Sequence, residues 1–258
     1  MVWKIFSKKS KKKKKVISYE EAKALAVDGD EKSRADLAGR NDVLREVLYY
    51  LADDPSPNVR KSIASNTAAP EHADLLLAKY KNENVRSSLA KKIARLSPGL
   101  TADEQNRLRH MTYDALSILA KDQATRVRQI LSEALRDVAN APPDVIRRLA
   151  WDVEAAVATP ALQFSLILND EDLIEIIRAK PSEGCTQTVS QRENVSNAVS
   201  SAIVDSSDTD AIALLLGNDS AQIREETLSK VIDQADQINL WHKPLAMRPR
   251  LPTSAAVK

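Results

Sequence analysis

Five arginines follow acidic corners of the sequence and form its strongest repeated pattern of charged groups. Arg34, Arg60 and Arg86 are spaced 26 residues apart, Arg128 follows 42 residues later, and Arg224 closes a more distant copy. Such a row could bind phosphate groups, because the planar guanidinium donates two parallel hydrogen bonds to an oxyanion. An acidic residue lies close to each of these arginines in the sequence. We therefore expect a structural ladder, in which each arginine bonds the acidic corner of its own or the next unit.

The N-terminal segment is the second group with evident chemistry. Residues 1–15 hold eight Lys and no acidic residue. On a helix, Val2, Trp3, Ile5 and Phe6 would lie within an arc of about 160°. Apolar insertion combined with attraction to anionic lipid binds proteins to membrane surfaces, so we predict such a site. Two alternatives are a solubilising tail and a nucleic-acid contact made by the lysines alone. The residues assigned to the membrane or anionic surface are Trp3, Ile5, Phe6, Lys8, Lys9, Lys11, Lys12, Lys13, Lys14 and Lys15.

Other side chains with catalytic or metal-binding potential are scattered. His72, His110 and His242 lie far apart, and none has a second His or Cys at metal-ligand spacing. Cys185 is the single cysteine, which excludes an internal disulfide and a multi-cysteine metal site. No glycine-rich loop of the kind that cradles phosphate groups occurs in the sequence. We therefore expect no catalytic residue, no metal ion and no cofactor, and we interpret the chain as a non-enzyme.

The arginine corners lie between segments with helical periodicity. Apolar residues recur on one helix face after a corner, as in Val85, Leu89 and Ile93. Pro70 stands where a preceding helix should begin, a position at which proline is tolerated. A repeat of 26–30 residues is typical of helical solenoids, in which no unit buries its apolar face alone. The predicted fold is all-α, an α-solenoid of helix, capped corner, helix units, with a break expected at Pro160.

Charge is divided unevenly along the 258 residues. The whole chain has a net charge of +2. Residues 1–15 contribute eight Lys and residues 243–258 four basic residues, with no acidic residue in either segment. Residues 16–242 hold 26 basic and 36 acidic residues, a net charge of −10. Nucleic-acid binding needs a positive groove with stacking aromatic rings, whereas aromatic residues make up only 4% of this chain. No apolar run approaches the roughly 18 residues of a membrane span, and no signal peptide is visible. We expect a cytoplasmic protein, with a peripheral position at the inner membrane face as a further hypothesis.

The second half of the chain carries the clearest family resemblance. The stretches APPDVIRRLAWD and LLLGNDSAQI, with the Gln-Arg-x-x-Val-Ser step at 191–196, resemble a bacterial family of unknown function with degenerate HEAT-like helical repeats. The Val-Arg units are also similar to leucine-rich-repeat-variant proteins, but the cysteine cluster that some of those carry is missing. The resemblance covers roughly residues 30–258. The resemblance implies a HEAT-like fold and no reaction, and the missing cysteine cluster argues against an iron–sulfur centre.

These patterns divide the chain into four parts. Residues 1–17 are expected to be a basic flexible tail and residues 18–140 the Val-Arg repeats. Residues 141–240 continue the helical repeats of the unknown-function family. Arg192 is echoed 56 residues later by Arg248, so residues 241–258 are expected to begin a further, truncated repeat.

Two functions of different classes fit these observations. The first is a non-catalytic scaffold or adaptor that binds a protein or peptide partner and is held at a membrane surface by its basic N-terminus. The alternative is a nucleic-acid-binding HEAT-like protein, in which the basic termini would make the contacts. The acidic balance of residues 16–242 favours the scaffold.

Overall fold

The structure is a computed structural model that describes residues 16–96 and 105–248, with side chains in 16–94 and 111–248. Within these ranges the chain forms sixteen helices and no strand, so the predicted all-α fold is confirmed. The helices are α1 (Tyr19–Asp28), α2 (Glu31–Ala38), α3 (Arg45–Leu51), α4 (Pro57–Ser65), α5 (Glu71–Ala78), α6 (Glu83–Leu96), α7 (Gln105–Leu119), α8 (Thr125–Leu135), α9 (Pro143–Ala150), α10 (Ala155–Phe164), α11 (Asp170–Ala179), α12 (Cys185–Ser190), α13 (Asn197–Asp205), α14 (Thr209–Leu216), α15 (Glu225–Ala235) and α16 (Asn239–Met247).

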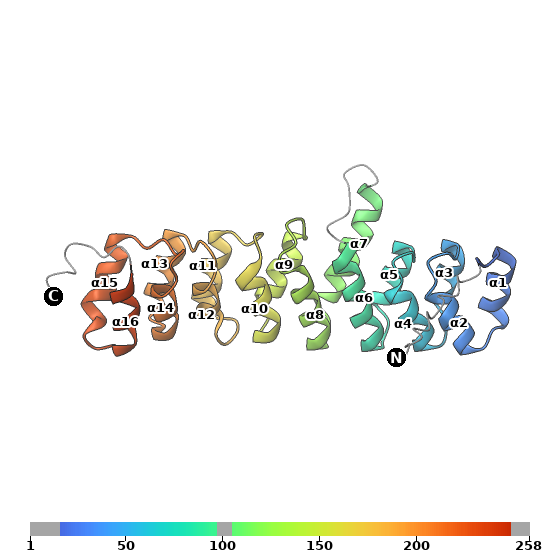
Figure 1. The fold of residues 1–258 in the computed structure, drawn as a ribbon, viewed down its shortest axis with the longest axis horizontal. Coiled ribbons are helices and arrows are strands. Elements are labelled where there is room, and N and C mark those ends of the chain that lie inside the picture. The colour runs from blue at the N-terminus through green and yellow to red at the C-terminus, as the bar shows by residue number, and fades with distance from the viewer. Residues whose placement is uncertain (1–15, 97–104, 249–258) are drawn as a thin grey trace, which may run out of the picture.

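Consecutive helices pair, and the pairs stack into an elongated row (Figure 1). The even-numbered helices contact one another in order from α2 to α16 and form one layer. The odd-numbered helices form the second layer, in which α9 and α11 hardly touch. Stacking of helical pairs along one axis is the arrangement of an α-solenoid. The HEAT-like character of the repeats remains a prediction.

Short polar side chains begin several of the helices and fix the corners between them. Ser18 accepts a hydrogen bond from the backbone N of Glu21 at 3.2 Å, and the Glu21 carboxylate accepts one from Ser18 N at 3.0 Å. Asn169 makes the same reciprocal arrangement at the start of α11. Ser56 caps α4, whose first residue is Pro57. These bonds satisfy amides that have no partner within the helix, so the helices begin at defined residues.

The core lies between the two layers and runs along the whole row. It consists of aliphatic side chains and many alanines, and Val59, Ile63, Val85 and Leu89 are fully buried in it. The small alanine side chains allow close approach of neighbouring helices, which matches the low aromatic content of the chain. The same residues carry the helical periodicity of the sequence.

Pro160 does not break the helix that contains it, so that expectation was wrong. α10 continues through Pro160 to Phe164. A proline inside a helix removes one backbone hydrogen bond. Val157, Ala161 and Leu162 are fully buried where α10 packs against α8 and α12. This packing holds the helix together across the missing bond.

The boundary expected at residue 241 falls inside α16 and needs correction. Trp241 is buried, and its Nε1 donates a hydrogen bond to the backbone O of Thr209 at 2.9 Å. α16 also packs against α14 and α15. Residues 241–248 therefore complete the α15–α16 pair instead of starting a further unit.

Candidate functional site

Four of the five predicted ladder arginines occupy the same place in successive units. Arg34, Arg60, Arg86 and Arg128 are each the fourth residue of an even-numbered helix, from α2 to α8. In the later three units, the residue six positions before the arginine contacts the arginine of the preceding unit. These residues are Asp54, Tyr80 and Asp122. Each of these corners therefore receives the arginine of one neighbour and directs its own toward the other neighbour.

Arg34 illustrates the contact. Its Nε donates to Oδ2 of Asp54 at 2.6 Å, its Nη2 to Oδ1 at 3.2 Å, and its Nη1 to the backbone O of Gly29 at 2.7 Å. The buried Asp54 carboxylate also accepts a hydrogen bond from Ser56 N at 2.8 Å. A two-point, charge-assisted bond of this kind is directional. It fixes the corner of α2 against the loop between α3 and α4.

Arg86 and Arg128 repeat this arrangement with Asp122 and Asp152. Nε of Arg128 donates to Asp152 Oδ2 at 2.6 Å, and Nη2 of Arg86 donates to Asp122 Oδ1 at 2.9 Å. The hydrogen bonds to these carboxylates raise the pKa of both arginines. Burial by itself would raise the pKa of Asp152, but the hydrogen bond from Arg128 contributes to holding that pKa below its ordinary value. The fold therefore favours the charged guanidinium groups of Arg86 and Arg128 and the charged carboxylate of Asp152.

Arg60 differs because Tyr80 stands where the neighbouring units place an aspartate. The guanidinium carbon of Arg60 lies 4.1 Å from the centre of the Tyr80 ring. Its Nη2 donates to Oδ1 of Asp53 at 2.9 Å, but the Asp53 side chain is 76% exposed. A stack on an aromatic ring and a solvent-screened ion pair thus replace the buried carboxylate.

The prediction that Arg224 belongs to the ladder is wrong. Arg224 is an exposed residue at the N-cap of α15, and its side chain makes no capping bond. α15 lies in the odd-numbered layer, whereas the ladder follows the starts of the even-numbered helices. In α10 and α12 the ladder position holds Ala158 and Thr188, so the ladder ends after α8.

Arg192 and Arg248 connect units in the second half of the chain, a role that the sequence reasoning missed. Arg192 donates from Nη1 to the backbone O of Leu162 and from Nη2 to that of Ser165 at 2.7 Å. Arg248 donates to the backbone O of Ala221 at 2.9 Å and to carbonyls at the end of α14. Burial lowers the pKa of both guanidinium groups. The sequence feature that could have indicated this role is the recurrence of the arginine after 56 residues.

Two asparagines bridge units in a similar way. Nδ2 of Asn66 donates to the backbone O of Ala38 at 2.7 Å and of Arg40 at 2.9 Å. Nδ2 of Asn218 makes the equivalent pair of bonds, at 2.9 Å to the backbone O of Ser190, the last residue of α12, and at 2.8 Å to that of Arg192. Each amide satisfies carbonyls that the preceding helical unit leaves open.

These contacts engage the four ladder guanidinium groups within the chain, so the ladder does not form an open row for phosphate. The residues predicted to bind an anionic surface, from Trp3 to Lys15, lie outside the described residues. Their role therefore stays a prediction.

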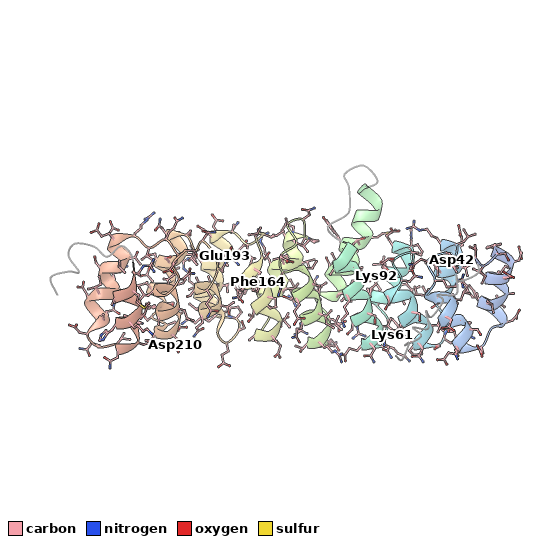
Figure 2. The ribbon with its side chains drawn as sticks, viewed as in Figure 1. Asp42, Lys61, Lys92, Phe164, Glu193 and Asp210 are labelled. Atoms are coloured by element: carbon pink, nitrogen blue, oxygen red, sulfur yellow. The ribbon has the colours of Figure 1, made fainter. Side chains whose placement is uncertain are left out.

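A buried ion pair joins Asp74 in α5 to Lys92 in α6, and Lys92 is labelled in Figure 2. Burial raises the pKa of Asp74 to about 6, although the attraction of Lys92 acts in the opposite direction. The two side chains are nearly closed to solvent, which makes them a structural contact. In the part of the chain that the structure describes, no three His, Cys, Asp or Glu side chains are grouped to hold a metal ion, and Cys185 is buried.

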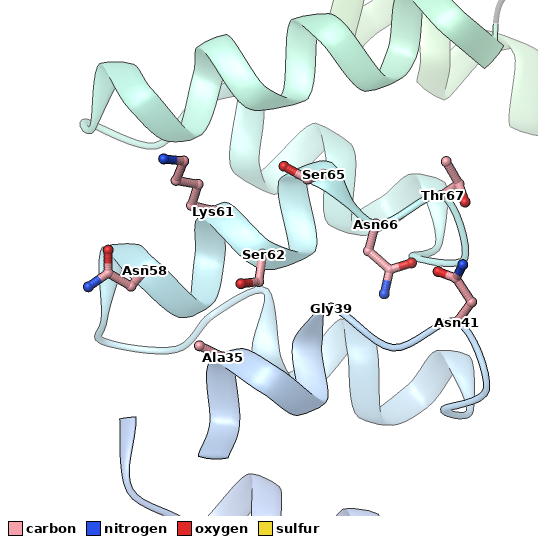
Figure 3. Close-up of a pocket in the computed structure, with 9 residues that line it drawn as sticks. All are labelled: Ala35, Gly39, Asn41, Asn58, Lys61, Ser62, Ser65, Asn66 and Thr67. Carbon is pink, nitrogen blue, oxygen red and sulfur yellow. The ribbon is translucent and has the colours of Figure 1, made fainter. Parts of the chain in front are cut away.

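A polar groove of about 600 Å³ lies between α2 and α4 (Figure 3). We call it the α2–α4 groove. Figure 3 shows Asn58 and Lys61 at one end and Asn41 at the other, with the small residues Ala35 and Gly39 between the ends. Polar side chains complete its wall: Ser62, Ser65, Asn66 and Thr67.

A second hollow, of about 200 Å³, lies between α1 and α3 and is mainly apolar. We call it the tyrosine hollow. Tyr19, Val27 and Tyr50 line it and are 47%, 58% and 58% exposed. Glu46 and Lys23 are the charged residues of its lining. An exposed group of large apolar side chains is typical of an interaction surface.

The stacked helical pairs define an all-α protein whose surface includes the α2–α4 groove and the tyrosine hollow. Residues 157–258 match the model of a family described as an uncharacterised protein conserved in bacteria (DUF2336). This match confirms the predicted resemblance to a bacterial family of unknown function for that segment. The comparison of the chain with curated proteins found no match. Within the described residues, none of the helices combines the length and apolarity required to cross a bilayer.

Proposed function

We propose that this chain is a non-catalytic helical-repeat scaffold that binds an extended segment of a protein partner in the α2–α4 groove. The observation that carries the proposal is the set of hydrogen-bonding side chains that the fold leaves open there. Lys61, Ser62 and Ser65 line the groove and make no side-chain bond within the described part of the chain. Asn66, in contrast, is already bonded: its Nδ2 bridges to the preceding unit and its Oδ1 accepts a hydrogen bond from Ala68 N.

The polarity of the groove favours a polypeptide over a small apolar ligand. Pockets for small molecules are mostly lined by hydrophobic and aromatic side chains, whereas this groove is lined by amides, hydroxyls and one lysine. Hydroxyl and amide groups in a row suit the regularly spaced N–H and C=O groups of an extended backbone. Lys61 at one end would favour an acidic side chain of the partner at that point.

We further propose that residues 1–15 hold the scaffold at an anionic membrane surface, as cytoplasmic peripheral proteins are held. The support is the combination of Trp3, Ile5 and Phe6 with a lysine block. Each lysine near an anionic leaflet contributes about 1 kcal/mol. Wild-type protein should sediment with anionic but not neutral liposomes. Trp3→Ala/Phe6→Ala and a lysine-depleted segment should both lose this binding, and retention of binding by the aromatic variant would refute the anchor.

The nucleic-acid alternative has weaker support. Residues 16–242 carry a net charge of −10, so they repel a polyanion such as nucleic acid. The ladder arginines, which could have formed a phosphate-binding row, are bonded within the chain.

The groove is tested by placing a photoreactive residue at Ser62 in otherwise intact protein and identifying what it captures in cells. Ser65→Arg, which fills the groove from an exposed position, should reduce capture about tenfold. The matched control is Ala198→Arg, an equally exposed change on α13. Equal capture after Ser65→Arg would refute the proposal, and nuclease-sensitive capture would identify the alternative function.

A further inference from the structure

The tyrosine hollow concentrates exposed aromatic residues in a chain that has few of them. Three of the five tyrosines of the chain, Tyr19, Tyr49 and Tyr50, lie at or beside it, and each is about half exposed. The hollow adjoins a wider depression that continues along α3. Exposed tyrosines with an apolar body and a polar tip are typical of surfaces that another segment covers.

The hollow exists because the first helix packs through small side chains. α1 buries only Ala22 and Ala26, and the larger Tyr19 and Val27 stay at the surface. An apolar cavity of about 150 Å³ holds a benzene molecule, so the 200 Å³ hollow has room for one aromatic side chain.

Acidic groups surround this apolar surface. Glu46 lines the hollow and Glu20 follows Tyr19 on α1, and neither forms an ion pair with the described residues. Asp53 lines the adjoining depression, but its carboxylate already accepts a hydrogen bond from Arg60. Arg34 is likewise bonded to Asp54, so Lys23 is the cation of the lining that can offset Glu46 and Glu20. The surface therefore fits a segment that combines aromatic side chains with several lysines.

We propose that the occupant of the tyrosine hollow is this chain's own N-terminal segment, residues 2–15. Trp3 or Phe6 supplies the aromatic side chain, and the lysine block lies beside the carboxylates of Glu46 and Glu20. The composition of the segment, four large apolar residues and eight Lys without an acid, is complementary to the surface.

Chain length permits this contact. Tyr19, which lines the hollow, lies three residues after Val16, the first described residue. Ten residues separate Phe6 from Val16, and an extended chain spans at most about 3.6 Å per residue, or roughly 35 Å in total. α1 is about 15 Å long, so the segment reaches every part of the hollow. Tethering gives it an effective concentration on the order of millimolar.

This inference goes beyond the partner groove and gives the N-terminal segment two competing places to bind. The same apolar and basic side chains that would enter an anionic lipid surface would occupy the hollow in solution.

Zero-length carbodiimide cross-linking of the full chain in solution tests the proposal, because it joins only lysines and carboxylates that touch. An equal mixture of ¹⁴N- and ¹⁵N-labelled chains separates cross-links within one copy from those between copies. We expect cross-links within one copy from Lys8–Lys15 to Glu46 and Glu20. Trp3→Ala/Phe6→Ala, which keeps every lysine, should reduce them at least fivefold.

Two further variants complete the test. Tyr50→Ser removes a wall of the hollow and should reduce the same cross-links, whereas Leu166→Ser, at an exposed apolar residue elsewhere, should leave them unchanged. Cross-links spread over all surface carboxylates, or unaffected by Trp3→Ala/Phe6→Ala, would overturn the proposal. Predominantly mixed-isotope cross-links would overturn it in favour of a second copy. Liposome binding and groove capture are measured separately, so their failure is distinguishable from failure here.

Discussion

Three arginine–aspartate ion pairs join neighbouring units between α2 and α10, and Arg192, Arg248 and Asn218 bond backbone carbonyls between α10 and α16. Both devices satisfy polar groups at the corners of the stack, but they respond to different conditions. An ion pair depends on the charge of its carboxylate and is weakened by salt. A carbonyl acceptor has no charge to lose. The two kinds of contact are chemically separable, and each half also holds an example of the other kind: Asn66 bonds carbonyls in the first half and Arg147 pairs with Asp172 in the second.

The largest effect is expected from Arg192→Ala. Removal of the guanidinium leaves the carbonyls of Leu162 and Ser165 without their donor in a buried place, and should lower the free energy of unfolding by about 3 kcal/mol. Arg192→Lys should not restore it, because an ammonium lacks the planar fork. Urea unfolding followed by circular dichroism measures the loss. Arg178→Ala, at an exposed arginine of α11, is the control, and equal midpoints would contradict the bridging role.

A smaller loss is expected from Arg86→Ala in the N-terminal half. Its charge-assisted bonds to Asp122 should contribute about 2 kcal/mol, against about 0–1 for an exposed charge such as Lys81. Thermal unfolding of Arg86→Ala and Lys81→Ala provides the comparison. High salt should reduce the difference in melting temperature between wild type and Arg86→Ala more than it reduces the difference between wild type and Arg192→Ala. If Arg86→Ala melts like Lys81→Ala, the ladder does not stabilise the stack.

Acid should distinguish the two halves further. The pKa of Asp152 is lowered in the folded chain, so its contribution is fully present above the ordinary value of 3.8 and is lost as the pH falls through the lower folded value. Asp152→Asn should therefore lower stability by about 1 kcal/mol at neutral pH, and the difference should shrink as the pH drops below 3.8. Urea midpoints measured from neutral to acidic pH test this. A difference that stays constant with pH would show that Asp152 acts without its charge.

The smallest effect is expected from Arg224→Ala. Arg224 lies exposed at the start of an odd-numbered helix, so its removal should change stability by less than about 0.5 kcal/mol. Differential scanning calorimetry of Arg224→Ala beside Arg128→Ala makes the comparison sharp. A loss of stability as large as that of Arg128→Ala would show that Arg224 does join neighbouring units.

The sequence was sufficient to predict the helical fold and four ladder positions because both depend on local spacing. Apolar periodicity specifies a helix face, and a 26-residue interval places successive arginines at equivalent corners. The same local pattern failed at Arg224, since an apolar residue followed by arginine does not reveal which layer the next helix joins. α15 is an odd-numbered helix, whereas the helices that follow the other four corners are even-numbered.

The remaining contacts involve backbone carbonyls and cannot be read from residue types. Leu162 and Ser165 accept bonds through atoms that every residue possesses, so nothing in their identity predicts the partner of Arg192. The surface hollows were missed for a related reason. Tyr19 and Tyr50 stand 31 positions apart in the sequence, and only the packing of α1 against α3 brings them together.

The way in which Asp54 and Asp122 serve two units has a consequence for how the chain folds. Each carboxylate completes its own corner by accepting a backbone N–H and also receives the arginine of the unit before it. A unit is therefore fully bonded only when its neighbour has formed. Stability in such a one-dimensional array is set by nearest-neighbour coupling, and order propagates along it from a nucleus. A unit that has already formed presents its arginine to the next unit and its carboxylate to the previous one, so these bonds can carry order in either direction along the chain.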